Sequence, residues 1–382
     1  MIRILLLLSL FFTCAETTAQ TVYFDFTTKE NRDTVKARLT KMVDETIAQP
    51  LSKNNLQQYQ SAFWAMELML YKPANMRSSI VQQISLLPLQ PAAYQRAFME
   101  MLYTLYQKEF VNEIESIWQK IDNSKVQAMC LEYLKLANIK PTLDKQYADL
   151  PLHLQLYKDE LNAQPILVKE ADLLVSDFLP NQIVVCSFQY HDRNKPGYLM
   201  IRTAEHSWLN DSMGNAARFP QLARAINNLP YYLTNGNTPQ GLYKLNGFDS
   251  SSIDWIGPTT NLQMVMPFEA ADKPFFTDTL HAVKQYEQLL PPVFRQYKPL
   301  WQSFWAGKIG RSEIIAHGTT IDPSFYKAAT YFPNTPSLGC LCSPELWDEQ
   351  GKRTYSAQQN WINALQSIGG GNNGYLIVVE LR

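Results

Sequence analysis

The stretch from 312 to 345, SEIIAHGTTIDPSFYKAATYFPNTPSLGCLCSPE, contains one histidine and one cysteine that could act as base and nucleophile. His317 ends the apolar run EIIA, which predicts a strand that holds the imidazole at its end. Cys340 follows Gly339 in a proline-bounded turn, where a glycine lets backbone N–H groups converge on a developing oxyanion. A thiol attacks carbonyls only as the thiolate, and a histidine produces it by taking the proton and later returning it to a leaving amine.

Ordinary roles fit the same residues. A lone histidine at a strand end is commonly structural or solvated, and a lone cysteine is commonly buried packing. Zinc is another alternative, because Cys340, Cys342 and His317 offer three ligands. The Cys-x-Cys spacing is tighter than usual for zinc, and no fourth ligand is evident in the sequence.

A further motif, NGNTPQGLYKL at 235–245, changes this balance. Taken with AHGT and SLGC, it resembles the L,D-transpeptidase (YkuD) family, whose members carry a Thr-Pro-x-Gly turn entering a strand, then His-Gly, then Ser/Thr-x-Gly-Cys. The three motifs stand here in that order, as Thr238-Pro239-Gln240-Gly241, His317-Gly318-Thr319 and Ser337-Leu338-Gly339-Cys340. The resemblance covers about 180–382 and does not extend to the N-terminal half.

The resemblance implies a cysteine that is acylated by a peptidoglycan stem peptide at the L-to-D bond before D-alanine. Transfer to an amine would give a 3-3 crosslink or protein attachment, and this chemistry needs no metal or organic cofactor. Cys340 would be the nucleophile and His317 the general base and acid. The carbonyl of Gly318 would orient the imidazole, the amides of Gly339 and Cys340 would form the oxyanion hole, and Ser337 would brace the turn. The residues expected on the substrate side are Ser337, Leu338, Thr319 and Cys342.

Two departures from the family pattern leave other functions open. Leu338 stands where the family usually has a His or another polar residue, and Cys342 where an Arg or Asn commonly follows. Cys342 could be a resolving thiol, a substrate contact or a turn residue. One alternative is therefore an L,D-carboxypeptidase or a hydrolase that releases wall proteins. Another is a non-catalytic envelope scaffold that binds wall peptides, with the helical half binding another envelope protein.

The N-terminus predicts export. MIRILLLLSLFFTCAETTAQ has a basic Arg3, an apolar run and then small and polar residues, which is typical of a signal peptide over 1–19. Cys14 raises a lipoprotein alternative, although the residues before it form a poor lipobox. We expect the mature chain to begin near Gln20, to lie in the periplasm or cell envelope, and to have no stable transmembrane segment.

The composition is that of a folded protein, with 46% hydrophobic and 18% charged residues. The 34 basic and 35 acidic side chains nearly cancel, so no broad field attracts nucleic acid. Four cysteines remain after signal cleavage, but Cys130 falls in a helical pattern and Cys186 in an apolar strand, which argues against a disulfide scaffold.

The pattern along the chain predicts an α+β protein, with an N-terminal all-α helical array followed by a mainly β, L,D-transpeptidase-like catalytic domain. Helices recur from 20 to 137, the first with Thr27 and Glu30 at capping-box spacing. A connector at 138–179 includes a predicted helix, LVKEADLLVSDFL. The β domain spans 180–382 and carries a helical insertion, 275–307, that could form a lid or cleft wall. Its predicted strands are QIVVCSF, GYLMIRT, PYYLTNG, GLYKL, LQMVMPF, SEIIAHG and GYLIVVEL.

Overall fold

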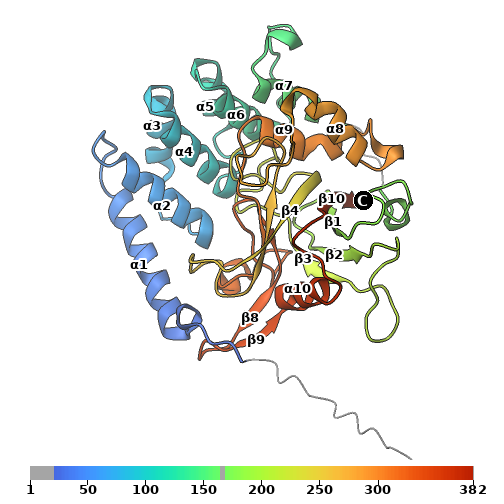
Figure 1. Ribbon diagram of the computed structural model, residues 1–382. Coiled ribbons are helices and arrows are strands. Elements are labelled where there is room, and N and C mark those ends of the chain that lie inside the picture. The colour runs from blue at the N-terminus through green and yellow to red at the C-terminus, as the bar shows by residue number, and fades with distance from the viewer. Residues whose placement is uncertain (1–20, 164–167, 382) are drawn as a thin grey trace, which may run out of the picture.

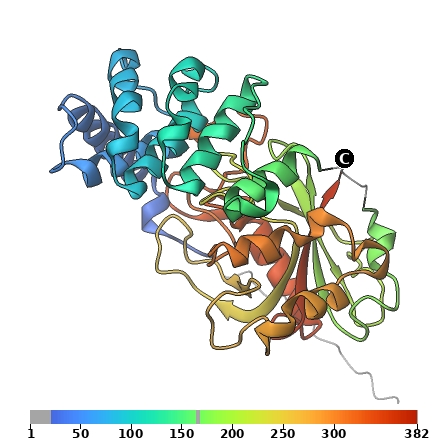
Figure 2. The same ribbon diagram turned by 90° about the horizontal axis from the view of Figure 1, so that it is seen from above.

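The computed structural model describes residues 21–163 and 168–381, and these form a mixed α+β structure (Figure 1). The predicted signal peptide and the lipidation alternative at Cys14 lie outside the described residues. The first half of the described chain is helical and the second half holds the strands. Figure 2 shows the N-terminal helices grouped on one side of the molecule, beside the strand-rich part.

The N-terminal half contains seven α-helices: α1 (Lys29–Ile47), α2 (Leu56–Met69), α3 (Arg77–Leu86), α4 (Ala92–Leu105), α5 (Val111–Glu115), α6 (Ser124–Leu136) and α7 (Leu152–Leu161). The helices recur over the range predicted, and α7 lies in the segment predicted as a connector. The cap of α1 is also one residue later than predicted, since the Thr28 side chain accepts from the amide of Asn31. Asn123 caps α6 in the same way, accepting from the amides of the first turn.

The helices and the strand-rich part share one continuous hydrophobic core. Phe63 and Phe98 from α2 and α4 belong to the same cluster of buried side chains as Tyr232 and Tyr326 from the second half. Both tyrosines also make polar contacts with the helices. The hydroxyl of Tyr326 donates to the carbonyl of Leu68 at 2.8 Å, and that of Tyr232 to the carboxylate of Glu132 at 2.7 Å. The helical half is therefore packed directly against the sheet.

The main sheet has eight strands in the order β3-β2-β1-β10-β4-β5-β6-β7. They are β1 (Val184–Tyr190), β2 (Gly197–Arg202), β3 (Phe219–Gln221), β4 (Gly241–Asp249), β5 (Asn261–Val265), β6 (Ala316–His317), β7 (Leu341–Cys342) and β10 (Tyr375–Leu381), while β8 (Glu345–Trp347) and β9 (Arg353–Ser356) form a separate hairpin. Two pairs are parallel, β1 with β10 and β6 with β7. The sheet is nearly closed, because Leu222, directly after β3, exchanges two backbone hydrogen bonds with Cys342 on β7.

Each face of this sheet packs against different helices, because alternate residues of a strand point to opposite faces. Val184 and Ile377 join the core under the insertion, which contains α8 (Ala282–Leu289) and α9 (Gln302–Lys308). Val185 and Val378 face the other core, which includes residues of α10 (Ala357–Ser367), a helix that the sequence did not reveal. The insertion thus packs against one face of the sheet.

The helix predicted at 167–179 is wrong for its described part. Only the 3-10 turn Glu170–Leu173 forms there. Arg202, buried on β2, donates to the carbonyls of Leu173, Phe178 and Leu179 at 2.7 to 3.0 Å. A helix would give such carbonyls to amides four residues later, so the buried guanidinium competes with it.

Two predicted strands also differ. The segment 230–236 is a series of turns, in which the amide of Leu233 bonds the carbonyl of Pro230 and that of Gly236 bonds the carbonyl of Leu233. The strand predicted over 312–318 reduces to the two residues of β6. Within residues 21–163 and 168–381, each helix is too short or too polar to cross a bilayer.

Two carboxylates lie buried against each other in the helical half. Glu67 on α2 accepts from the Thr104 hydroxyl at 3.3 Å, and Glu100 on α4 accepts from the Asn235 side-chain amide at 3.2 Å. Burial raises the pKa of Glu100 to about 7, and burial together with the charge of Glu100 raises the pKa of Glu67. These groups therefore favour folding in their protonated forms.

Replacing Glu100 with Gln should remove part of the pH dependence of stability. Because the folded pKa lies above that of an unfolded glutamate, the contribution is complete below the unfolded pKa and is lost as pH rises through about 7. We expect Glu100→Gln to gain about 1 to 3 kcal/mol in unfolding free energy over the wild type between about pH 5 and pH 8. Urea unfolding at both pH values measures this. The exposed Glu115→Gln on α5 is the control, and an equal change in both variants would contradict the assignment.

Candidate functional site

The fold brings together the three motifs of the suspected site. Strands β6 and β7 are parallel neighbours that pair Ala316 with Leu341 and His317 with Cys342. Cys340 immediately precedes β7, so the histidine and the cysteine lie on adjacent chain segments. The Thr238 hydroxyl donates to the carbonyl of Gly339 at 2.9 Å. The Thr-Pro-x-Gly turn thus contacts the Ser-x-Gly-Cys turn directly.

His317 is buried and its ring is held by its own chain. Its Nδ1 hydrogen-bonds the carbonyl of Gly318, at 2.5 Å. A carbonyl only accepts, so Nδ1 carries the proton and Nε2 keeps its lone pair. Burial lowers the pKa of His317, against a smaller opposite effect of the Gly318 bond. The imidazole is therefore neutral near neutral pH and can accept a proton at Nε2.

The thiol of Cys340 is partly accessible, but it is not directed to the histidine. Its Sγ lies 3.6 Å from the carbonyl of Glu313, and no hydrogen bond joins it to His317 in the described structure. Burial raises the pKa of Cys340, while the nearby guanidinium of Arg311 lowers it and the carboxylates of Glu313 and Glu269 raise it. The resting group is thus a protonated thiol, which needs a base to react.

Ser337 braces the turn before the cysteine. Its hydroxyl donates to the carbonyl of Cys340 at 2.8 Å and accepts from the amide of Gly339 at 3.1 Å. This second bond occupies one of the two amides expected in the oxyanion hole, so the amide of Gly339 is not open in this arrangement. Gly339 has φ +111, and a Cβ there would lie 2.4 Å from Nη2 of Arg311. The turn therefore requires glycine.

Two of the four residues expected on the substrate side are buried. Leu338 is about half exposed beside the turn. Cys342 and Thr319 are both fully buried, Cys342 with its Sγ 3.8 Å from the Thr335 hydroxyl and Thr319 hydrogen-bonded to that same hydroxyl. Both side chains are packed inside this arrangement, and the substrate role expected of Cys342 and Thr319 stays a prediction. Burial raises the pKa of Cys342 to about 12, which leaves it an inert thiol.

Sequence reasoning missed two residues that position the site. Glu345 is buried and accepts from the Thr319 amide at 3.1 Å and the Thr259 hydroxyl at 2.7 Å. Its carboxylate lies so close to Gly318 that a Cβ there would be 2.3 Å from an oxygen. Arg311 donates to the carbonyls of Gly236 and Asn237, both at 3.0 Å. Neither residue belongs to a motif, and only their charge within apolar surroundings could have marked them.

The described residues give no support to the zinc alternative. Among residues 21–163 and 168–381, His, Cys, Asp and Glu side chains form no group that could hold a metal ion. The four described cysteines are all free thiols. The zinc alternative needs Cys340 and Cys342 on one ion, whereas the Cys342 sulfur packs against Thr335 and the Gly318 carbonyl.

Comparison of the chain with protein-family models, with curated proteins and with solved structures gives no match. The site must therefore be interpreted from its own geometry.

The Gly339 turn can be tested by a matched pair of substitutions. Gly310 also has a positive φ, +87, but has open space where a Cβ would be. Gly310→Ala should cost about 1 to 2 kcal/mol from backbone strain alone. Gly339→Ala should cost about 2 kcal/mol more, because it also displaces Arg311 and the Gly236 carbonyl. Urea unfolding compares the two, and equal losses would show that the close packing at Gly339 is unimportant.

The raised pKa of Cys340 predicts a particular alkylation profile. Iodoacetamide reacts with thiolate, whose fraction rises about tenfold per pH unit below the pKa. Labelling of Cys340, followed by peptide mass spectrometry, should reach its plateau at a higher pH than labelling of a free cysteine peptide does. A plateau below about pH 7 would instead indicate a preformed thiolate.

Proposed function

We propose that this chain is a cysteine-dependent acyltransferase, and specifically a peptidoglycan L,D-transpeptidase. The observation that carries the proposal is the convergence of the three motifs, with Thr238 bonded to the turn of Cys340 and His317 on the neighbouring strand. The order of these motifs in the sequence resembles the L,D-transpeptidase family. The three motifs are far apart in the sequence, and their proximity in the structure supports a common role in one site.

The proposed reaction begins with a rotation of the Cys340 side chain away from the Glu313 carbonyl. His317 Nε2 then takes the thiol proton, and the thiolate sulfur attacks the carbonyl carbon of the scissile amide. The C–N bond breaks as the imidazolium returns the proton to the leaving amine, which leaves a thioester on Cys340. An acceptor amine attacks the thioester carbonyl and loses its proton to His317, the C–S bond breaks to release the Cys340 thiolate, and the imidazolium returns the proton to this sulfur.

The anion that forms in each step needs hydrogen-bond donors near the sulfur. The amide of Cys340 is one donor, and that of Gly339 becomes a second when the Ser337 hydroxyl turns away. The charge of Arg311, which already favours the thiolate of Cys340, adds to this stabilisation. The neutral resting state of His317 suits the first proton transfer.

The substrate class follows from the resemblance and from the sequence before the described part. The resemblance points to a stem peptide that is cut before D-alanine, and the proposed signal peptide would deliver the enzyme to the periplasm or cell envelope, where such peptides occur. The nature of the acceptor decides between transfer and hydrolysis at the same thioester.

Mass analysis of a purified disaccharide-tetrapeptide tests the proposal. Incubation with the mature protein should remove the terminal D-alanine, and Cys340→Ala or His317→Ala should lower this turnover at least about a thousandfold, because each removes a reacting group. Cys186→Ala, on β1, is the matched thiol control. Crosslinked dimers identify transfer and tripeptides identify hydrolysis. Full turnover in either site variant would refute the mechanism, and an unchanged tetrapeptide with the wild type would exclude this substrate.

A further inference from the structure

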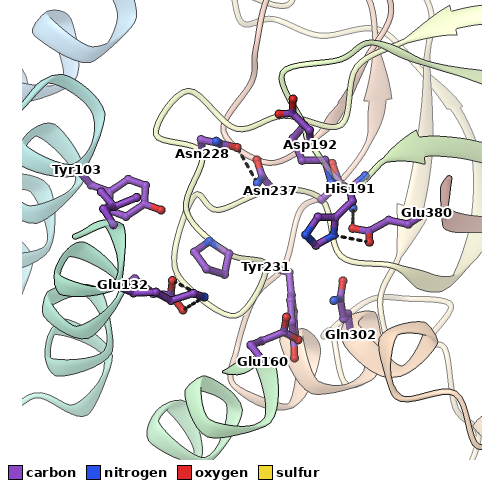
Figure 3. A pocket seen from close by; sticks show the side chains of 15 residues that line it. Tyr103, Glu132, Glu160, His191, Asp192, Asn228, Tyr231, Asn237, Gln302 and Glu380 are labelled. Atoms are coloured by element: carbon purple, nitrogen blue, oxygen red, sulfur yellow. Dashed lines mark hydrogen bonds and ion pairs between the residues drawn. The ribbon is translucent and has the colours of Figure 1, made fainter. Parts of the chain in front are cut away.

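A cavity of about 410 Å³ lies between the helical half and the sheet (Figure 3). Helices α4, α6 and α7 contribute Tyr103, Glu132 and Glu160, and the opposite side includes His191 and Glu380. Its lining residues do not include Cys340 or His317, although Thr238 reaches it. Cavities between structural units are a common place for small-ligand sites.

Most charged side chains around this cavity form ion pairs, and among those that the structure describes Glu160 and the exposed Asp192 do not. Glu132 pairs with Lys135 at 3.0 Å, and Glu380 pairs with Arg193 at 2.9 Å and with His191 at 3.0 Å. Glu160 makes no ion pair in the described part of the chain, and its side chain hydrogen-bonds only the uncharged groups of Tyr231 and Gln302. Glu160 is partly buried, and this burial raises its pKa to about 7 against an opposing effect of the nearby Lys135 charge.

A second cavity, of about 420 Å³, shares Glu160 and Tyr231 with the first. Its other lining includes Trp301 and Trp305 from the insertion, the carboxylate of Glu287 on α8, and the ion pair of Lys298 with Asp159 at 3.3 Å. Aromatic faces attract ammonium groups and also pack against methylene chains. Glu160, which forms no ion pair in the described chain, therefore lies on the wall shared by the two cavities, and the tryptophans line the second cavity.

We propose that these two cavities form a binding site for a primary amine carried on an alkyl chain. The ammonium group pairs with the carboxylate of Glu160, which forms no ion pair in the described part of the chain. The alkyl chain lies along Tyr231, Trp301 and Trp305, and a second ammonium on the chain is attracted to Glu287. This inference is independent of the acyltransferase proposal, because it concerns binding at residues that are distinct from the cysteine and histidine.

The site should prefer mildly alkaline solution. The charged groups around Glu160 are Glu132 and Lys135 on α6, Glu380 on β10, His191, Asp192 and Arg193 after β1, and Asp159, Glu287 and Lys298 in the second cavity. A ligand ammonium stays protonated up to about pH 10, whereas Glu160 is ionised mainly above about 7. Affinity should therefore rise between about pH 6 and pH 8.

Isothermal titration calorimetry with 1,5-diaminopentane tests the site. We expect binding to the wild type at about pH 8, and no comparable binding of 1,5-pentanediol, which has the same chain without charge. Glu160→Gln should weaken the diamine at least about tenfold, as expected for loss of a charge-assisted hydrogen bond. Glu160→Asp keeps the charge and should retain part of the affinity, and the exposed Asp149→Asn should bind like the wild type.

Circular dichroism confirms that each variant is folded before titration. Equal diamine affinity in the wild type and Glu160→Gln would overturn the proposal, as would equal binding of the diol or no binding of the diamine at millimolar concentration. The pH rise in affinity should disappear in Glu160→Gln, and its persistence would assign it to His191 instead and contradict the role of Glu160.

Discussion

The arrangement around the cysteine depends on the place of one guanidinium, that of Arg311. It donates to the carbonyls of Gly236 and Asn237, just before the Thr238 turn, and its Nη2 lies against Gly339. A cation that loses water must be surrounded by acceptors, so the segment before Thr238 turns its carbonyls inward. Burial lowers the pKa of Arg311 to about 10, which leaves it charged at neutral pH. One side chain thus shapes the turn and provides positive charge beside the thiol.

The helical half takes part in the structure of the second half rather than forming a separate unit. The hydroxyl groups of Tyr232 and Tyr326 bond to groups of α6 and α2, and Asn235 bonds to Glu100 on α4. The segment that carries Thr238 is thereby held between helices on one side and Arg311 on the other. The cavity around Glu160 lies at this same junction, where helices and strands cannot pack every polar group against a partner.

Local sequence patterns predicted those strands whose own residues are mostly apolar and buried. β1 and β10 are apolar and contain paired valines, and β4 and β5 carry leucine, tyrosine and methionine at mostly buried positions. The prediction from local pattern was wrong where contacts with distant residues determine the backbone conformation. At 167–179 the guanidinium of Arg202 claims carbonyls that a helix would need, and at 230–236 the apolar tyrosines are buried within turns rather than in a ladder. The local hydrophobic pattern carries no information about the Arg202 hydrogen bonds or about the burial of these tyrosines.

The sequence by itself determined which residues are chemically capable, namely Cys340, His317 and the glycines beside them, together with the mixed α+β composition. These depend on residue type, order and short-range pattern, which the chain carries locally. Only the tertiary structure decided that Thr238 meets the cysteine turn, that Cys342 is buried and Leu338 is exposed, and that Glu160 forms no ion pair in the described chain. The physical reason is that burial and charge pairing depend on segments hundreds of residues apart, whose proximity is a property of the packed chain alone.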